Sequence, residues 1–205
     1  NMDRVMGNYV RCILRDLDGT VVEDIENYMK LDEKATLYPP QPYVAQPGDL
    51  QILANLIHHE GCEGYFTSLL NGDQERGQAA SRVTGYVCIN RALVNYGNYG
   101  TTIVDQIAAP GQYSTKDVVL NGPDVTCEYC LANAEWCLTY DCMSVTNPSG
   151  EEMQRNILGQ SGWCQGCSPK YSCWWWVDST GDGSPTEYTG PGAGFDTFFC
   201  ANNSY

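Results

Sequence analysis

The clearest hydrophobic pattern in the chain predicts an α-helix over residues 47–61. Leu50, Leu53 and Ile57 are spaced by three and four residues, and Glu60 follows three residues later. Residues at this spacing share one face of an α-helix. The pattern therefore places the carboxyl group of Glu60 at the end of an apolar stripe, in the last turn of the helix.

The predicted position of Glu60 suits a proton donor. Apolar surroundings disfavour a charged carboxylate, and so does the negative end of a helix dipole. Both effects favour the protonated form, which a general acid needs at neutral pH. The alternative interpretation is that the side chain leaves the stripe at the frayed helix end and is hydrated. The pattern alone does not decide between the two.

A second long helix is predicted over residues 74–94. Its inner stripe is formed by Ala79, Val83, Val87 and Asn90, and the small side chains allow close packing against another helix. Asn90 is the one polar residue on this stripe, so it is a candidate for a buried hydrogen bond.

Shorter elements are expected in the rest of the chain. Residues 62–73 are predicted to form a loop, residues 103–107 a short helix or strand, and residues 125–139 a third helix. From residue 147 onward the chain is rich in Gly, Ser, Pro and aromatic residues, which predicts mostly loop and a final strand at 195–200. The expected fold class is α+β, mostly helical, with small β elements and a Cys-rich, loop-rich C-terminal region.

The N-terminal part of the chain differs from the rest. Residues 1–45 hold short strand-like pieces at 9–14 and 20–22 and end in a Pro-rich stretch around residues 38–42. This organisation predicts an N-terminal extension with a linker over 1–45, followed by a single domain over 46–205.

Net charge limits the partners of this 205-residue chain. The charge is −14 and there are only 11 Lys and Arg residues, which argues against nucleic acid and anionic membrane surfaces as partners. No apolar run is long enough to span a bilayer and no N-terminal stretch reads as a signal peptide, so we expect no membrane insertion. A start at Asn1-Met2-Asp3 suits a processed product or an excised domain. The 14 Tyr and 5 Trp residues favour a polymer held by stacking and hydrogen bonds, and nothing specifies an oligomeric state.

Cysteine usage is high and predicts an oxidising environment with disulfide bonds. The alternative is zinc, because the pairs Cys127-x-x-Cys130 and Cys164-x-x-Cys167 supply four thiolates. We favour disulfides, since the gap between the pairs is long for a zinc ribbon and three further cysteines lie in the same region. An odd count leaves one thiol, and Cys88 in an apolar helical stretch is the best candidate. The eleven cysteines are Cys12, Cys62, Cys88, Cys127, Cys130, Cys137, Cys142, Cys164, Cys167, Cys173 and Cys200.

A weak calcium candidate lies in the C-terminal region. Asp178, Thr180 and Asp182 supply oxygens at the first, third and fifth positions of a loop, and a glycine follows at the sixth. The twelfth position is Thr189, which lacks the bidentate carboxylate of a calcium loop, so a Gly-rich turn is favoured. The only histidines are His58 and His59, which excludes a multi-histidine metal site, so we expect no metal at the active site and no cofactor.

Several segments form an ordered set along the chain. In the first, an apolar helix ends in His58-His59-Glu60, and the others follow at characteristic distances. The segments are 53–60, Gly77-Gln78-Ala79, Val83, Val87, Asn90-Arg91, 102–107, Gly111-Gln112-Tyr113-Ser114, Cys130-Leu131-Ala132-Asn133-Ala134, Gly192-Ala193-Gly194 and Phe198-Phe199. In order and spacing they resemble the SleB/CwlJ family of cell-wall hydrolases, closely over residues 46–140 and loosely in the tail. The chain departs from that family at Gly61, where alanine is common, and in an inserted loop at 62–76.

The resemblance implies a lysozyme-like domain that cleaves peptidoglycan between N-acetylmuramic acid and N-acetylglucosamine, with Glu60 as catalytic acid and base. It implies a lytic transglycosylase, which manages with one carboxylate where a hydrolase normally needs two. The partner would be a peptidoglycan glycan strand, and the location extracellular or associated with a cell wall or spore.

Three further residues are candidates for the site. Gln112 and Tyr113 are candidates for sugar contacts, and Asn90 for a hydrogen bond that supports the site. Asn90 could instead satisfy a buried backbone group, and Tyr113 could belong to the core. Four other carboxylates remain as possible second catalytic groups: Glu63, Asp73, Glu75 and Asp105. The rival function is a catalytically inactive extracellular glycan-binding or structural module of the same fold.

Overall fold

The structure, a computed structural model, describes residues 2–6, 9–15, 21–25, 38–161, 171–177 and 197–202. The chain divides into two compact units, Asn1–Pro39 and Pro40–Tyr205.

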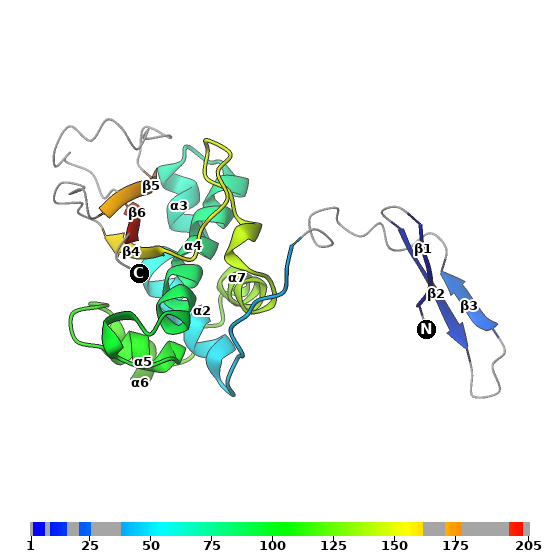
Figure 1. Ribbon diagram of the computed structural model, residues 1–205, viewed down its shortest axis with the longest axis horizontal. Coiled ribbons are helices and arrows are strands. Elements are labelled where there is room, and N and C mark those ends of the chain that lie inside the picture. The colour runs from blue at the N-terminus through cyan, green and yellow to red at the C-terminus, as the bar shows by residue number, and fades with distance from the viewer. Residues whose placement is uncertain are drawn as a thin grey trace. The chain divides into compact units, whose positions relative to one another are not determined.

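The N-terminal unit contains a three-stranded antiparallel sheet in the order β1-β2-β3 (Figure 1). Its strands are β1 (Met2–Met6), β2 (Tyr9–Arg15) and β3 (Val21–Ile25). The strand-like pieces predicted at 9–14 and 20–22 correspond to β2 and β3, and β1 was not predicted.

The second unit contains helices and a small sheet, which confirms the α+β class in this coarse form. Its helices are α2 (Asp49–Gly61), α3 (Glu63–Leu69), α4 (Gln74–Leu93), α5 (Ile103–Ala108), α6 (Lys116–Asn121) and α7 (Glu128–Thr139), with 3-10 turns at η1 (Tyr96–Asn98) and η2 (Cys142–Ser144). None of the helices in the described ranges has the length and apolar character that crossing a membrane requires.

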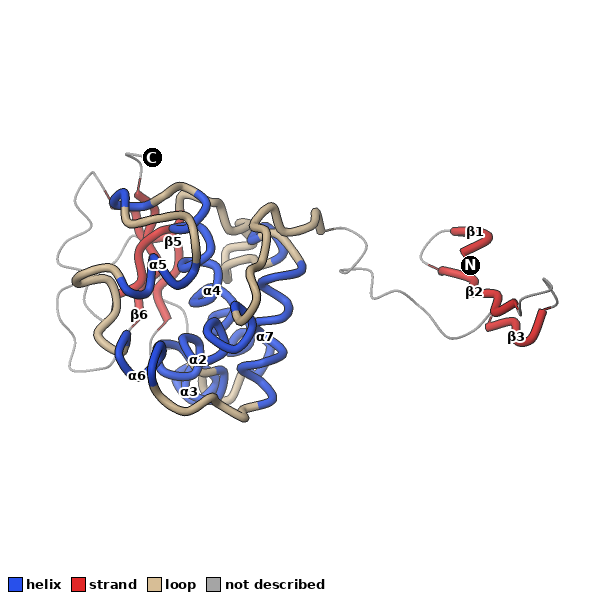
Figure 2. Tube along the Cα trace, turned by 90° about the horizontal axis from the view of Figure 1, so that it is seen from below, coloured by secondary structure: helices blue, strands red, loops and turns tan. Residues whose placement is uncertain are grey.

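Helix α4 lies at the centre of this unit. It contacts α2, α3, α5, α7 and the first strand of the C-terminal sheet. From Ser81 to Ala92 only Arg82 is not fully buried, which is typical of a helix surrounded on all sides. Figures 1 and 2 show the sheet and α7 on opposite sides of α4.

The C-terminal sheet has three antiparallel strands in the order β4-β6-β5. They are β4 (Ile157–Ser161), β5 (Tyr171–Val177) and β6 (Thr197–Asn202). The predicted final strand is confirmed as β6, whereas the expectation of loop from residue 147 missed β4 and β5. Phe199 of β6 joins the sheet to the helices, since its ring lies 6.1 Å from Phe66 of α3 and 6.2 Å from Trp175 of β5.

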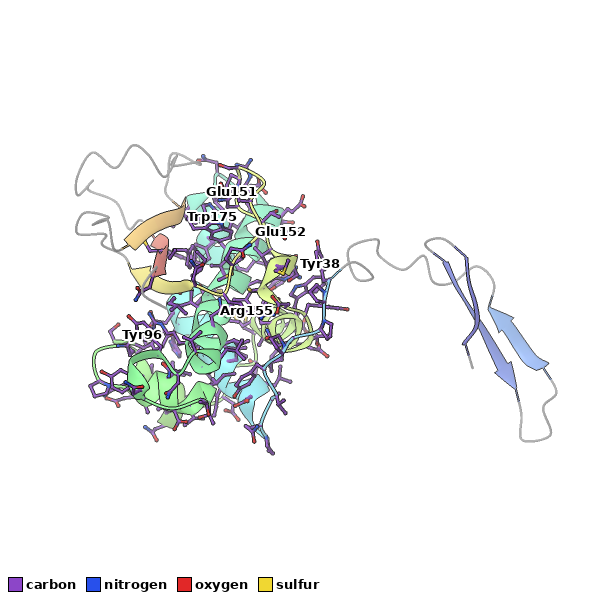
Figure 3. The ribbon with its side chains drawn as sticks, in the orientation of Figure 1. Tyr38, Tyr96, Glu151, Glu152, Arg155 and Trp175 are labelled. Carbon is purple, nitrogen blue, oxygen red and sulfur yellow. The ribbon has the colours of Figure 1, made fainter. Side chains whose placement is uncertain are left out.

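Trp175 is part of the core. It is 2% exposed, and Figure 3 shows it where β5 meets the helices. Its neighbour Trp174 is 8% exposed, and a register shift between Cys173 and Trp175 lets two successive side chains be buried. These two tryptophans therefore stabilise the fold.

The loop predicted at residues 62–73 is wrong in its first half, which forms α3. This helix packs closely on the start of α4: a Cβ atom at Gly77 would overlap the Thr67 hydroxyl and lie 2.8 Å from the Thr67 backbone nitrogen. A seven-residue helix shows too little periodicity to be recognised from sequence.

Part of the predicted linker belongs to the second unit. Gln41 donates its side-chain amide to the carbonyls of Cys137 and Tyr140, at 2.9 and 3.2 Å. Tyr43 is 7% exposed in the core and donates its hydroxyl to Asp49 at 2.8 Å. The boundary between the units therefore lies at residue 39 instead of 45.

Candidate active site

A cleft of about 540 Å³ opens at the C-terminal end of α2. The end of α2, the start of α3, the loop after α5 and the strands β4 and β6 all contribute to it. Its described lining residues are His58, His59, Glu60, Gly61, Cys62, Tyr65, Gln112, Ser114, Gln160 and Thr197. Most of these side chains are polar, and Tyr65 adds an aromatic ring that is 41% exposed.

Glu60 lies in this cleft, in the last turn of α2, and is half-buried. The Thr115 hydroxyl donates a hydrogen bond to its Oε1 atom. The side chain of Gln160 on β4 donates to the Glu60 backbone carbonyl at 2.9 Å. Contacts from two distant segments therefore fix both the carboxyl group and the helix end that carries it.

The apolar stripe that leads to Glu60 is shorter than predicted. Leu53 and Ile57 are fully buried, whereas Leu50 is 43% exposed. The stripe begins one turn later because Leu50 lies in the first turn of α2, at the surface.

Gly61 follows the glutamate in a crowded position. A Cβ atom there would overlap the Thr84 hydroxyl of α4 and lie 2.8 Å from the Phe66 ring. Glycine at this position lets the end of α2 approach α4 and α3, and this close approach sets the depth of Glu60 in the cleft.

Gln112 lines the same cleft as Glu60, and its role as a sugar contact stays a prediction. Tyr113 does not line the cleft. It is 6% exposed, and the Arg91 guanidinium carbon lies 5.0 Å from the centre of the Tyr113 ring. Burial raises the pKa of Tyr113 well above its usual range. The prediction of a sugar contact is therefore wrong for Tyr113, because alternate residues of this loop face the cleft and the core.

Asn90 is also a structural residue. It is 1% exposed, and its side-chain amide donates to the carbonyls of Gln154 and Ile157, at 3.4 and 3.3 Å. The neighbouring Arg91 donates to the Leu158 carbonyl at 2.6 Å. These bonds hold β4 on α4, and Asn90 contributes to the site only through the position of that strand.

The four alternative carboxylates lie outside the lining of the cleft. Glu63 accepts a hydrogen bond from Asn133 at 2.9 Å, and Asp73 caps the start of α4. Asp105 closes a capping box with Thr102 at the start of α5. Glu75 lines a separate hollow beside Trp175. Among the described lining residues, Glu60 is the only carboxylate.

Tyr65, Thr115 and Gln160 are among the residues of the site that were not anticipated from the sequence. Thr115 directly follows the Gly111–Ser114 segment, so its neighbourhood was a usable signal. Tyr65 belongs to the missed helix α3 and Gln160 to the missed strand β4. Their roles depend on contacts between segments up to 100 residues apart in sequence.

A group of sulfur and imidazole ligands borders the same end of α2. His58, Cys62, Cys127 and Cys130 place one ligand atom each within 4.8 Å of one another. Burial raises the pKa of Cys130, and the neighbouring Cys127 and Cys62 thiols raise it further. This cluster is the arrangement in the described part of the chain that could hold a metal ion.

Disulfides are not found among the described cysteines of the helical core. Cys62, Cys88, Cys127, Cys130, Cys137 and Cys142 are free thiols. Cys88 is buried as predicted, and burial raises its pKa to about 12. The second pair of the four-thiolate set considered from the sequence, Cys164 and Cys167, lies outside the described residues. The calcium candidate at Asp178, Thr180 and Asp182 also lies outside them.

Comparison with protein families, curated proteins and solved structures finds no match to this chain. The function is therefore inferred from the residues and geometry of the cleft.

Proposed function

We propose that this protein cleaves peptidoglycan glycan strands as a lytic transglycosylase, at the bond between N-acetylmuramic acid and N-acetylglucosamine, on a lysozyme-like domain. The observation that carries the proposal is Glu60, a half-buried carboxyl group held by the Thr115 hydroxyl in a polar cleft. The described lining supplies one carboxylate, which is enough for a reaction in which the same group is acid and then base.

The reaction follows from one carboxyl group and one substrate hydroxyl. Protonated Glu60 gives its proton to the glycosidic oxygen as the bond from that oxygen to the anomeric carbon breaks. The 6-hydroxyl of the same muramic acid residue then attacks the anomeric carbon and gives its proton to the Glu60 carboxylate. The products are a chain with a free 4-hydroxyl and a 1,6-anhydro-muramic acid end, no water is consumed, and Glu60 is protonated again.

Thr115 suits both halves of this reaction as a positioning residue. A hydroxyl group can donate to a carboxylate and can accept from a protonated carboxyl group. The hydrogen bond can therefore persist while Glu60 changes its protonation state. Holding one carboxyl oxygen also restricts rotation of the group, which favours productive geometry.

The cleft also suits a glycan. Gln112 and Ser114 present amide and hydroxyl groups that can bind sugar hydroxyls and N-acetyl groups, and Tyr65 presents a ring face for a sugar. Its volume of about 540 Å³ lies within the usual range for ligand sites. Within the described lining no Lys or Arg contributes, which suits a recognised segment without charge.

The test is the Glu60→Gln variant assayed on purified sacculi. The amide keeps the shape of the side chain and removes the proton, so release of soluble muropeptides should fall by about 10²–10⁴-fold. Glu63→Gln is the matched control, because Glu63 is not among the described lining residues of the cleft and the glutamine oxygen can still accept from Asn133. Mass spectrometry of the wild-type products should show anhydro-muropeptides, lighter by one water than the hydrolytic products.

A second pair of variants tests the positioning role of Thr115. Thr115→Val removes the hydroxyl at constant shape and should lower kcat by about tenfold with little change in KM. Thr115→Ser should restore most of the activity.

Equal activity of wild type and Glu60→Gln would exclude Glu60 as the acid. Glycan binding without cleavage by the wild type would instead support the inactive binding module.

A further inference from the structure

We propose that His58, Cys62, Cys127 and Cys130 form a structural zinc site that joins the end of α2 to the start of α7. The proposal stands on the geometry of these four side chains and does not depend on the proposed activity. It departs from the disulfide framework and from the four-thiolate set that the sequence suggested.

Two helix ends present the ligands in pairs. His58 and Cys62 are four residues apart, so the imidazole in the last turn of α2 and the thiol just past its end lie on one side. Cys127 and Cys130 are three residues apart, at the N-cap and in the first turn of α7. The helices α2 and α7 pack against each other, which brings the two pairs together.

The distances fit one tetrahedral ion. The Cys130 Sγ atom lies 4.0 Å from Cys62 Sγ and 3.7 Å from His58 Nδ1. With Zn–S near 2.3 Å and Zn–N near 2.0 Å, the edges of a tetrahedron are about 3.8 Å between two sulfurs and about 3.5 Å between sulfur and nitrogen. All four ligand atoms lie within 4.8 Å of one another, so small movements would close the site.

A disulfide would explain less of this arrangement. A disulfide joins two sulfurs at about 2.05 Å and leaves the third thiol and the imidazole without a role. Four convergent ligands of the types Cys, Cys, Cys and His are instead a known structural zinc set. Such a set fills the coordination sphere, so the ion would hold the fold and leave no position for substrate.

The helix ends give independent support. Cys62 is the N-cap of α3 and Cys127 is the N-cap of α7, and neither makes the side-chain hydrogen bond that usually caps a helix. At Cys127, a thiolate bound to zinc would place negative charge at the positive end of the α7 dipole. Cysteine in place of the usual Ser, Thr, Asp or Asn is thereby explained.

Binding would replace three protons with one ion. The thiols of Cys62, Cys127 and Cys130 each release a proton to solvent and form a Zn–S bond, and neutral His58 contributes a nitrogen lone pair. No electron transfer is involved, so zinc stays divalent and the sulfurs stay reduced.

The site would also define the position of Glu60. Two ligands of the proposed zinc ion lie close to this glutamate in sequence: His58 is two residues before it and Cys62 is two residues after it. An ion held by both, and by α7, would prevent fraying of the last turn of α2. The part of the cleft wall that His58 and Cys62 line would then be fixed in place.

The first experiment measures metal in the full-length protein purified under reducing conditions without added chelator. Elemental analysis should find one zinc per chain, and exchange to Co²⁺ should give the visible absorption of a tetrahedral thiolate site. Removal of zinc by a chelator should lower the Tm by at least about 5 °C. Less than one-tenth of an equivalent of metal, before and after incubation with Zn²⁺, would overturn the proposal.

The second experiment compares adjacent histidines. His58→Gln should lower zinc content at least tenfold in the presence of a competing chelator, whereas His59→Gln should keep one zinc, because its ring lies outside the cluster. Cys130→Ser should behave like His58→Gln, and the buried Cys142→Ser should not. Full metal retention by His58→Gln would overturn the ligand set, and so would a disulfide among Cys62, Cys127 and Cys130 in unreduced protein that lacks zinc.

Discussion

At the scale of single residues, the position after Glu60 shows how the fold constrains the site. Gly61 lies against Thr84 of α4 and Phe66 of α3, with no room for a methyl group. Glu60 itself was predictable because its signal is local: an apolar helical stripe that ends in a carboxyl group. The need for glycine at position 61 was not predictable, because Thr84 comes from another helix.

Gly61→Ala should therefore destabilise the protein by about 1–3 kcal/mol, the usual cost of overpacking in a core. The added methyl group must displace the Thr84 hydroxyl or the Phe66 ring, and either movement shifts the end of α2. Denaturant unfolding followed by circular dichroism measures the loss. Activity should fall as well, because Glu60 is the preceding residue.

Gly64→Ala is the matched control for this variant. Gly64 lies in α3 with open space where a Cβ atom would be added, and alanine favours helix over glycine by up to about 1 kcal/mol. This variant should be as stable as the wild type or more so. The double variant Gly61→Ala/Thr84→Ala should recover part of the loss, since it removes the overlapping hydroxyl. Equal stability of Gly61→Ala and wild type would show that the end of α2 has room for a methyl group beside Thr84 and Phe66.

At the scale of elements, the parts that were predicted from sequence are those with local periodicity. The long helices α2 and α4 have clear apolar patterns. Both ends of each helix lie within two residues of the predicted ends. The helix α3 and the strands β4 and β5 are short and depend on pairing with distant segments, so the sequence did not reveal them. The same reason explains the ligand cluster, where His58 and Cys130 are 72 residues apart.

Asn90 provides a test of how α4 holds the sheet. Asn90→Ala leaves the carbonyls of Gln154 and Ile157 without this donor in a buried region, which should cost about 1–3 kcal/mol. The expected result is a lower free energy of unfolding, measured with denaturant. Activity should fall only as far as β4 and Gln160 move away from Glu60.

A glycan-binding measurement separates this role from a sugar contact. In the Glu60→Gln background, Asn90→Ala should keep its affinity for glycan strands at temperatures where it is folded. Asn121→Ala serves as the control, because Asn121 is exposed at the end of α6 and should change stability by less than about 0.5 kcal/mol. A large loss of affinity with unchanged stability would return Asn90 to the list of substrate contacts.

At the scale of the whole molecule, the proposed activity belongs to one of the two units. The cleft, the carboxyl group and the ligand cluster all lie within Pro40–Tyr205. Composition predicted that the N-terminal part is separate, because Pro residues and short strands distinguish it from the helical region. The predicted boundary was residue 45, because a turn-rich sequence continues to that point. The contacts of this segment with the second unit already begin at residue 40.

Two truncations decide where this unit begins. A chain of residues 40–205 keeps Gln41 and Tyr43, so it should unfold with nearly the same midpoint as the full chain and release muropeptides at the same rate. A chain of residues 46–205 loses the buried Tyr43 ring and leaves the buried Asp49 carboxylate without its hydroxyl partner. Removing a large buried aromatic side chain costs about 3–5 kcal/mol, so this chain should be much less stable or fail to fold. Tyr43→Ala in the 40–205 chain should reproduce most of that loss, because the ring packs in the core and its hydroxyl also accepts the Ile103 backbone N–H at 3.2 Å. Equal stability of the two truncated chains would show that the segment before α2 adds nothing to the fold, and would move the boundary back to residue 45.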